Sequence, residues 1–131
     1  MSEATAILCL GSNTDDKIEA VEAALAMVST LGRISADSGN YPTAPERSPK
    51  GGPAYNNRVV FLDTALGCDE LRRLTKEYET GVRARHKGPG IAVDIDIVVF
   101  DSNAVSEVDI VSDYFREGIR RIGSEIPCSI V

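Results

Sequence analysis

The residues best suited to chemistry in this chain are Asp94 and Asp96, which lie in the apolar run of residues 93–100. Side chains alternate across a strand, so both carboxylates should point to one face, with their Cβ atoms roughly 6–7 Å apart. We expect Val98 and Phe100 to continue on the aspartate face, which is therefore not simply a wet surface.

Two neighbouring carboxylates repel each other and lose hydration, and a divalent cation removes both costs. Magnesium suits the pair because it takes one or two carboxylates and completes its octahedron with waters and phosphate oxygens. A solvated Asp-x-Asp on an open sheet face is the alternative, and from this short pattern alone it is the commoner case.

A cationic segment precedes the aspartates and contains Arg83, Arg85, His86 and Lys87, followed by Gly88-Pro89-Gly90. We expect a glycine-bounded loop here, which could hold a triphosphate against metal ions because arginine presents planar, forked donors. A solvated charged loop explains the same residues equally well. His86 is the only histidine and has no identifiable partner, so no catalytic role is assigned to it.

Tyr55 and Asn57 should share one face of a further strand. An aromatic ring beside a carboxamide, which both donates and accepts, suits a planar heterocycle with mixed edges. Thr43, across a proline-rich loop at residues 42–54, could add main-chain polar groups. A tyrosine and an asparagine at the start of a strand without any ligand are, however, commoner. Gly11-Ser12-Asn13 lacks the lysine of a phosphate loop and fits a turn with a helix cap better.

The elements that must position these residues follow from hydrophobic periodicity. The patterns predict strands at residues 5–10, 34–41, 55–64 and 93–100, and helices at 16–30, 69–80 and 112–122. The first strand should stop at Gly11, and Asn13, Thr14 or Asp15 should cap the first helix. The buried stripes should be Ile18, Val21, Leu25 and Val28 on the first helix and Leu71, Leu74 and Tyr78 on the second.

This order predicts an α+β fold of the ferredoxin-like βαββαβ kind, which is a four-stranded antiparallel sheet with two helices on one face. A short C-terminal helix should follow, within a single domain of residues 1–131. The tail at residues 124–131 gives no signal and could be disordered.

Composition limits the function. Hydrophobic residues make up 43% of the 131, with no run long enough to span a bilayer and no signal peptide, which indicates a cytoplasmic protein with no membrane partner. The net charge of −6 argues against a nucleic-acid surface. The basic stretch at residues 72–87 instead suggests a small anionic ligand. Three cysteines in no zinc spacing are best explained as reduced apolar fillers.

Taken together, the motifs resemble one family, the hydroxymethyldihydropterin pyrophosphokinases of folate biosynthesis. The resembling segments are, in order, Leu10-Gly11-Ser12-Asn13, Tyr41-x-Thr43-x-Pro45, Pro53-x-Tyr55-x-Asn57, Leu71 to Glu79, and Asp94-Ile95-Asp96-Ile97. Each motif is weak alone, but their order from about Ile7 to Phe100 is specific.

The resemblance implies an ATP-dependent pyrophosphokinase that binds a pterin and ATP as its small-molecule partners. Its catalytic residues would be Asp94, Asp96, Arg83 and Arg85, and the two aspartates would bind two Mg²⁺ ions. The pterin pocket would be lined by Thr43, Pro45, Tyr55 and Asn57, and the ATP contacts would come from Arg83, Arg85, Lys87, Tyr114 and Arg116. The oligomeric state is not indicated.

The chain departs from the family pattern where ATP contacts are expected. The family's Gly-Pro-Arg is Gly88-Pro89-Gly90 here, its Pro-His-Tyr is Ser112-Asp113-Tyr114, and its loop tryptophan is missing. Three hypotheses therefore stay open: an active pyrophosphokinase, a catalytically impaired pterin- or nucleotide-binding relative, and an unrelated ferredoxin-like interaction domain.

Overall fold

A computed structural model describes residues 3–43 and 54–123 of the chain. Its strands are β1 (Ala4–Ser12), β2 (Arg33–Asp37), β3 (Tyr41–Thr43), β4 (Tyr55–Thr64), β5 (Asp94–Phe100) and β6 (Asn103–Ala104). Its helices are α1 (Lys17–Val28), α2 (Cys68–Arg85), α3 (Glu107–Ile110) and α4 (Asp113–Ile122). The predictions for Pro45 and for the tail at residues 124–131 lie outside the described residues.

The strands form one antiparallel sheet in the order β2-β4-β1-β5-β6, with β3 pairing with β4. The α+β class and the antiparallel sheet are confirmed, but the sheet has six strands and the prediction of four is wrong. The predicted strand at 34–41 is two strands, separated near Gly39 at φ 72°. The short β3 and β6 escaped prediction because two or three residues carry no readable alternation.

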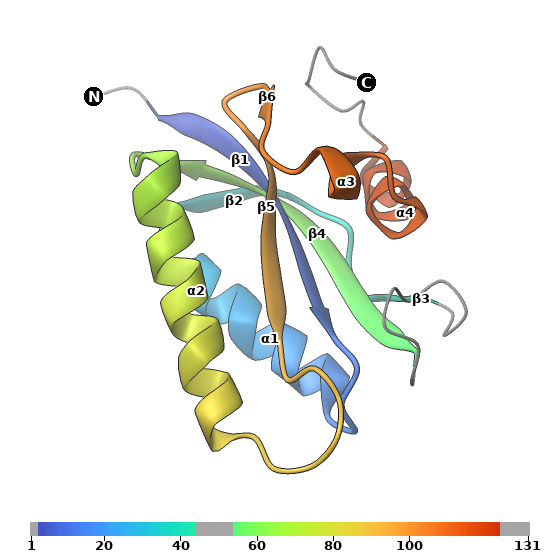
Figure 1. The fold of residues 1–131 in the computed structure, drawn as a ribbon. Coiled ribbons are helices and arrows are strands. Elements are labelled where there is room, and N and C mark those ends of the chain that lie inside the picture. Colours follow the sequence, from blue (N-terminus) through green and yellow to red (C-terminus); the bar gives the residue numbers. More distant parts are fainter. Residues whose placement is uncertain (1–2, 44–53, 124–131) are drawn as a thin grey trace.

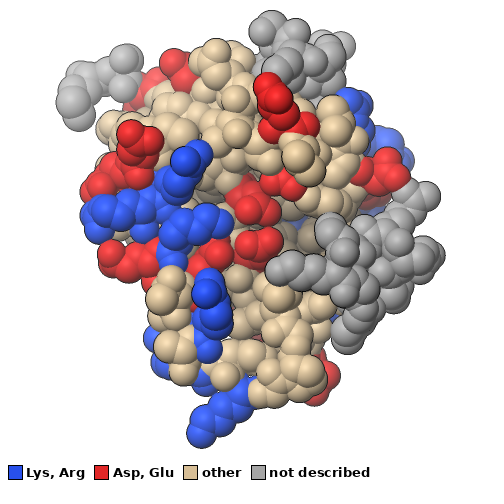
Figure 2. Space-filling view, in the orientation of Figure 1, with Lys and Arg blue, Asp and Glu red and all other residues tan. Residues whose placement is uncertain are grey.

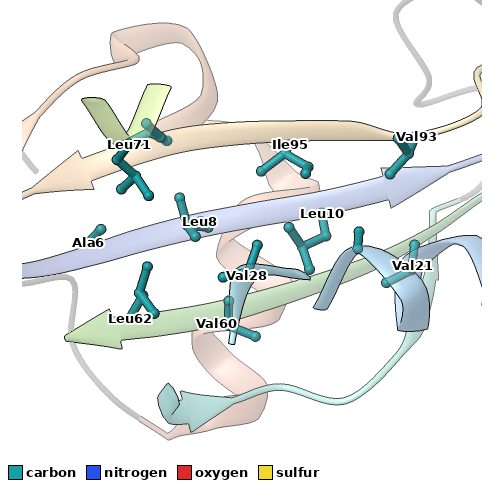
Figure 3. Close-up of a cluster of buried hydrophobic side chains, with 12 residues drawn as sticks. Ala6, Leu8, Leu10, Val21, Val28, Val60, Leu62, Leu71, Val93 and Ile95 are labelled. Atoms are coloured by element: carbon teal, nitrogen blue, oxygen red, sulfur yellow. The ribbon is translucent and has the colours of Figure 1, made fainter. Parts of the chain in front are cut away.

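Helices cover both faces of the sheet, α1 and α2 on one and α3 and α4 on the other (Figure 1). The first core lies under α1 and α2 (Figure 3) and contains Ala6, Leu8, Leu10, Val21, Ala24, Val28, Val60, Leu62, Leu71, Val93, Ile95 and Ile97. The second core contains Ile7, Cys9, Tyr41, Val59, Val98, Val99, Ile110, Phe115 and Ile119. The predicted C-terminal helix is α4, and it closes this second core with α3.

A register shift changes which face the end of β5 presents. Ile97 pairs with Leu8, but Val99 pairs with Ile7, so Val98 is an extra residue in the ladder. Val98 and Val99 both join the second core, whereas Phe100 packs against the first. The expectation that Phe100 continues on the aspartate face is therefore wrong, because the bulge interrupts the two-residue alternation.

The first strand and helix also differ from their predictions. β1 continues through Gly11 to Ser12, since both residues still pair with β4. The cap of α1 is Asp16, which makes no capping side-chain bond, so the three predicted caps are wrong. Ile18 is 51% exposed, and the buried stripe of α1 is Val21, Ala24 and Val28.

The second helix is longer than predicted and runs to Arg85, so Arg83 and Arg85 are helical residues rather than loop residues. Gly81 does not end it, because an interior glycine weakens a helix without breaking it. Its buried positions are Leu71, Thr75 and Glu79, whereas Leu74 and Tyr78, which were predicted on the buried stripe, are only half-buried. Within residues 3–43 and 54–123, no helix is both long enough and apolar enough to cross a bilayer.

Two glycines in helices should respond oppositely to the same substitution. A Cβ at Gly118 in α4 would stand 2.2 Å from Val59 Cγ2 and 2.6 Å from Tyr41 Oη, whereas one at Gly81 would meet only Arg85 Nη1 at 3.5 Å. We expect Gly118→Ala to lower the free energy of unfolding by about 1–3 kcal/mol through overpacking. Gly81→Ala should raise it by about 0.5–1 kcal/mol through helix propensity. Urea denaturation measures both, and a shift of the same sign in the two variants would contradict the close packing of α4 on the sheet.

Candidate functional site

The pairing of three strands places the candidate residues in adjacent rows on one face of the sheet. In one row Asp94 pairs with Gly11, which pairs with Asn57 on its other side. In the next row Asp96 pairs with Cys9. Neighbouring strands lie about 4.8 Å apart, so roughly 10 Å separates the Asp94 and Asn57 backbones. Gly11 fills the position between them without a side chain.

A cavity of about 500 Å³ opens over these rows, within the range of small-molecule sites. Its described lining comprises Cys9, Gly11, Thr43, Tyr55, Asn57, Glu79, Arg83, His86, Gly90, Ile91, Ala92, Val93, Asp94, Asp96 and Tyr114. Asp94, Asp96, Thr43, Tyr55 and Asn57, which the sequence suggested separately, thus lie around one space.

The Thr43 end of the cavity is an ordered polar and aromatic surface. Asn57 donates its side-chain amide to Thr43 Oγ1, and both residues are buried. A Cβ at position 11 would lie 3.0 Å from Asn57 Oδ1 and 3.6 Å from Tyr55 Cδ2. The glycine therefore leaves room for the amide and the ring to stand beside the sheet. These groups offer a planar ligand a flat contact and a fixed carbonyl acceptor.

The other end of the cavity is acidic. The pKa of Asp96 is raised from 3.8 to about 7, first by burial and then by repulsion from Asp94, Asp109 and Glu79, against the opposing attraction of Lys76. Lys76 Nζ lies 3.8 Å from Asp96 Oδ1, and the Asp96 side chain is 30% exposed. A carboxyl in this setting is stabilised either by a proton or by a bound cation.

The free edge of β5 between the two aspartates is bonded to α2. Glu79 Oε2 accepts from Ile95 N at 3.0 Å, and Lys76 Nζ donates to Ile95 O at 3.1 Å and to Glu79 Oε2 at 2.9 Å. The Lys76–Glu79 ion pair thereby provides hydrogen-bond partners for the Ile95 N–H and C=O groups, which a further strand would otherwise bind. Glu79 had no predicted role, although its spacing of four residues from Thr75 and eight from Leu71 places it on the buried stripe of α2.

The predicted ATP-binding residues separate into two groups. Arg83 lines the cavity from the last turn of α2. His86, for which the sequence predicted no role, is the C-cap residue of α2 and also lines the cavity. Arg85, Lys87 and Arg116 are not among the described lining residues. Figure 2 shows acidic side chains near the centre of this face with basic side chains beside them.

Tyr114 reaches the cavity because α3 and α4 hold it there. Tyr41 Oη donates to Tyr114 O at 2.6 Å, and Tyr114 Oη donates to Asp109 Oδ1. Asp109 also accepts from Ser106 Oγ at 2.7 Å. Asp109 is thus committed to hydrogen bonds that position the tyrosine.

The carboxylate oxygens in the cavity fit a hard divalent cation that takes only some of its ligands from the protein. No group of three His, Cys, Asp or Glu converges on a metal position in the part of the chain that the structure describes. Glu79 and Asp109 are engaged in hydrogen bonds, so Asp94 and Asp96 are the carboxylates available in the cavity. Magnesium accepts two carboxylates together with waters and phosphate oxygens.

Comparison with protein families agrees with this geometry. The sequence model of 7,8-dihydro-6-hydroxymethylpterin-pyrophosphokinase matches residues 7–128. The match confirms the resemblance drawn from the ordered motifs and excludes a chance likeness to an unrelated interaction domain. Because the matched segment spans most of the chain, the protein belongs to the 7,8-dihydro-6-hydroxymethylpterin pyrophosphokinase family.

Proposed function

We propose that this protein transfers pyrophosphate from ATP to the hydroxymethyl group of 6-hydroxymethyl-7,8-dihydropterin. The observation that carries the proposal is the shared cavity, in which Asp94 and Asp96 face the same space as Thr43, Tyr55 and Asn57. Family membership indicates the reaction, and the cavity supplies a polar aromatic end and an acidic end at which its two substrates could meet.

The pterin is proposed to lie at the Thr43 end. Its ring would pack beside Tyr55, over the space left by Gly11, and its amino and amide edge would face Asn57. The hydrogen bond to Thr43 fixes the Asn57 amide in one orientation, so its carbonyl oxygen is presented as an acceptor. A preorganised acceptor favours binding because little side-chain entropy remains to be lost.

The triphosphate is proposed to lie at the acidic end. Magnesium bound there would neutralise phosphate charge and polarise the phosphorus under attack. Asp94 and Asp96 would hold the ions, and Arg83 would contact the phosphates from the end of α2. The pterin hydroxyl oxygen would then form a bond to the β-phosphorus and release its proton to water. The bond between the β-phosphorus and the oxygen that bridges it to the α-phosphate would break, and AMP would leave with that oxygen. The chain contributes chiefly position and electrostatics to such a step.

A second candidate function is ligand binding without turnover. It is favoured by Gly90, which stands where the family pattern has an arginine, and by the placement of Arg85, Lys87 and Arg116 outside the described cavity lining. Loss of phosphate contacts would reduce catalysis more than it reduces pterin binding.

We also propose that β1, α1, β2, β4, α2 and β5 form a ferredoxin-like unit. The support is the strand order β2-β4-β1-β5 with antiparallel neighbours throughout. The strands β3 and β6 and the helices α3 and α4 would then be additions that complete the cavity.

The activity prediction is that ATP, Mg²⁺ and the pterin alcohol yield AMP, and that Asp96→Ala abolishes its formation. Removing one of two metal-binding carboxylates should cost at least about a hundredfold in rate. Asp69→Ala is the matched control, since Asp69 is exposed in the first turn of α2 and its nearest cavity-lining residue in the sequence is Glu79, near the other end of that helix. Chromatographic detection of AMP measures both. Pterin binding without AMP would select the binding-only candidate, and no binding of either ligand would refute the proposal.

A pterin-binding prediction follows from the Thr43–Asn57 hydrogen bond. Thr43→Val keeps the shape but removes the acceptor of the Asn57 amide. We expect pterin affinity to fall by about fivefold to tenfold, because a buried donor is left unpaired and the amide is free to rotate. Affinity for a non-hydrolysable ATP analogue with Mg²⁺ should be unchanged. Calorimetric titration with each ligand tests this, and equal losses for both would argue against separate ends of the cavity.

A third prediction concerns stability without ligands. Because the folded-state pKa of Asp96 lies above its ordinary value, the contribution of Asp96 to the free energy of unfolding falls as pH rises from about 4 to about 7, and its destabilising effect is complete above this window. Asp96→Asn should therefore raise the free energy of unfolding at pH 8 by on the order of 2 kcal/mol, with the gain fading below pH 4. The same variant should lose Mg²⁺ binding. Urea titrations across pH measure the first effect, and a destabilised variant at pH 8 would contradict it.

A further inference from the structure

The segment Ser12-Asn13, part of a motif that the proposed reaction does not use, is bonded to the chain just before β5. Asn13 N donates to Ile91 O at 3.2 Å, and Ile91 N donates to Asn13 Oδ1 at 2.5 Å. Ser12 Oγ also donates to Ile91 O at 3.1 Å. Ser12 is fully buried and Asn13 is 6% exposed. Both backbone polar groups of Ile91 are thus satisfied from the end of β1.

The neighbouring residue, Gly90, allows Asn13 to approach the backbone closely. Gly90 has φ 97°, and a Cβ there would lie 2.9 Å from Asn13 Oδ1 and 3.1 Å from Asn13 O. Any other residue at position 90 would strain the backbone at this positive φ, and its side chain would clash with Asn13. Position 90, where the family pattern has an arginine, is a glycine in this chain, and the missing side chain leaves room for Asn13.

The anchored segment is a wall of the cavity. Gly90, Ile91, Ala92 and Val93 all line it, and Asp94 follows directly as the first residue of β5. Ahead of the anchor, the chain from the end of α2 contains Gly88 at φ 112°, and residues 86–90 form neither a helix nor a strand. The contact with Asn13 therefore extends the pairing of Gly11 with Asp94 and holds the wall just ahead of β5.

We propose that Asn13 is a positioning residue for the nucleotide end of the cavity. It acts by holding Ile91 so that the wall at residues 90–93 and the Asp94 carboxylate keep their places. The inference rests on the proposed function. It predicts that losing the Asn13 acceptor weakens binding of Mg²⁺ with nucleotide and leaves pterin binding intact, because Thr43, Tyr55 and Asn57 lie on β3 and β4.

The test is calorimetric titration of Asn13→Ala with Mg²⁺ and a non-hydrolysable ATP analogue, and separately with the pterin alcohol. We expect about a tenfold loss of nucleotide affinity, the effect of one buried hydrogen bond, and pterin affinity within about twofold of the original. Asn13→Asp keeps the acceptor oxygen and should restore most of the loss. Asn103→Ala, at the exposed first residue of β6, is the control and should change neither affinity.

A second measurement keeps the inference separate from the proposed function. Amide hydrogen exchange should show the Ile91 N–H losing protection in Asn13→Ala but not in Asn103→Ala, whether or not nucleotide binds. If the unaltered protein binds no nucleotide while Ile91 behaves as expected, the proposed function fails and the anchor stands. Equal loss of both ligands in Asn13→Ala, no rescue by Asn13→Asp, or unchanged Ile91 exchange would overturn the inference. Should Asn13→Ala not fold, Gly90→Ala must give the same selective loss.

Discussion

The antiparallel register of β1 with its two neighbours is the constraint on which the site depends. β1 is paired along both edges, with β4 on one side and β5 on the other. That register aligns Asp94, Gly11 and Asn57 in one row and leaves the middle position without a side chain. A slip of one residue on either edge would turn the aspartates or the asparagine into the opposite core.

The two cores on either side of the sheet make this register costly to change. Alternate residues of β1 belong to different cores, with Leu8 under α1 and α2 and Ile7 under α3 and α4. The bulge at Val98 lets β5 contribute two successive residues to the second core while the aspartates remain in register. The acidic cavity is therefore held by apolar packing that continues beyond it, and by the Lys76–Glu79 pair along the β5 edge.

Sequence alone determined the parts of the molecule that depend on local periodicity. The strand at residues 55–64 coincides with β4, and helix α4 lies within the predicted range with Ser112 as its cap. The shared face of Asp94 and Asp96 followed from two-residue alternation, which is a property of any strand. The ordered motifs identified the family, since short patterns in a fixed order retain information that each pattern lacks alone.

Only the tertiary structure decided which residues meet. The assembly of Tyr55 and Asn57 with the aspartates depends on strand order and register, which are not properties of a local window. The inclusion of Glu79 and His86 in the cavity, and the exclusion of Arg85, follow from where α2 ends and how it lies on the sheet. The hydrogen bond from Ile91 N to Asn13 Oδ1 joins residues that are 78 positions apart in the chain. Periodicity cannot supply these contacts, because they arise when separate elements share one core.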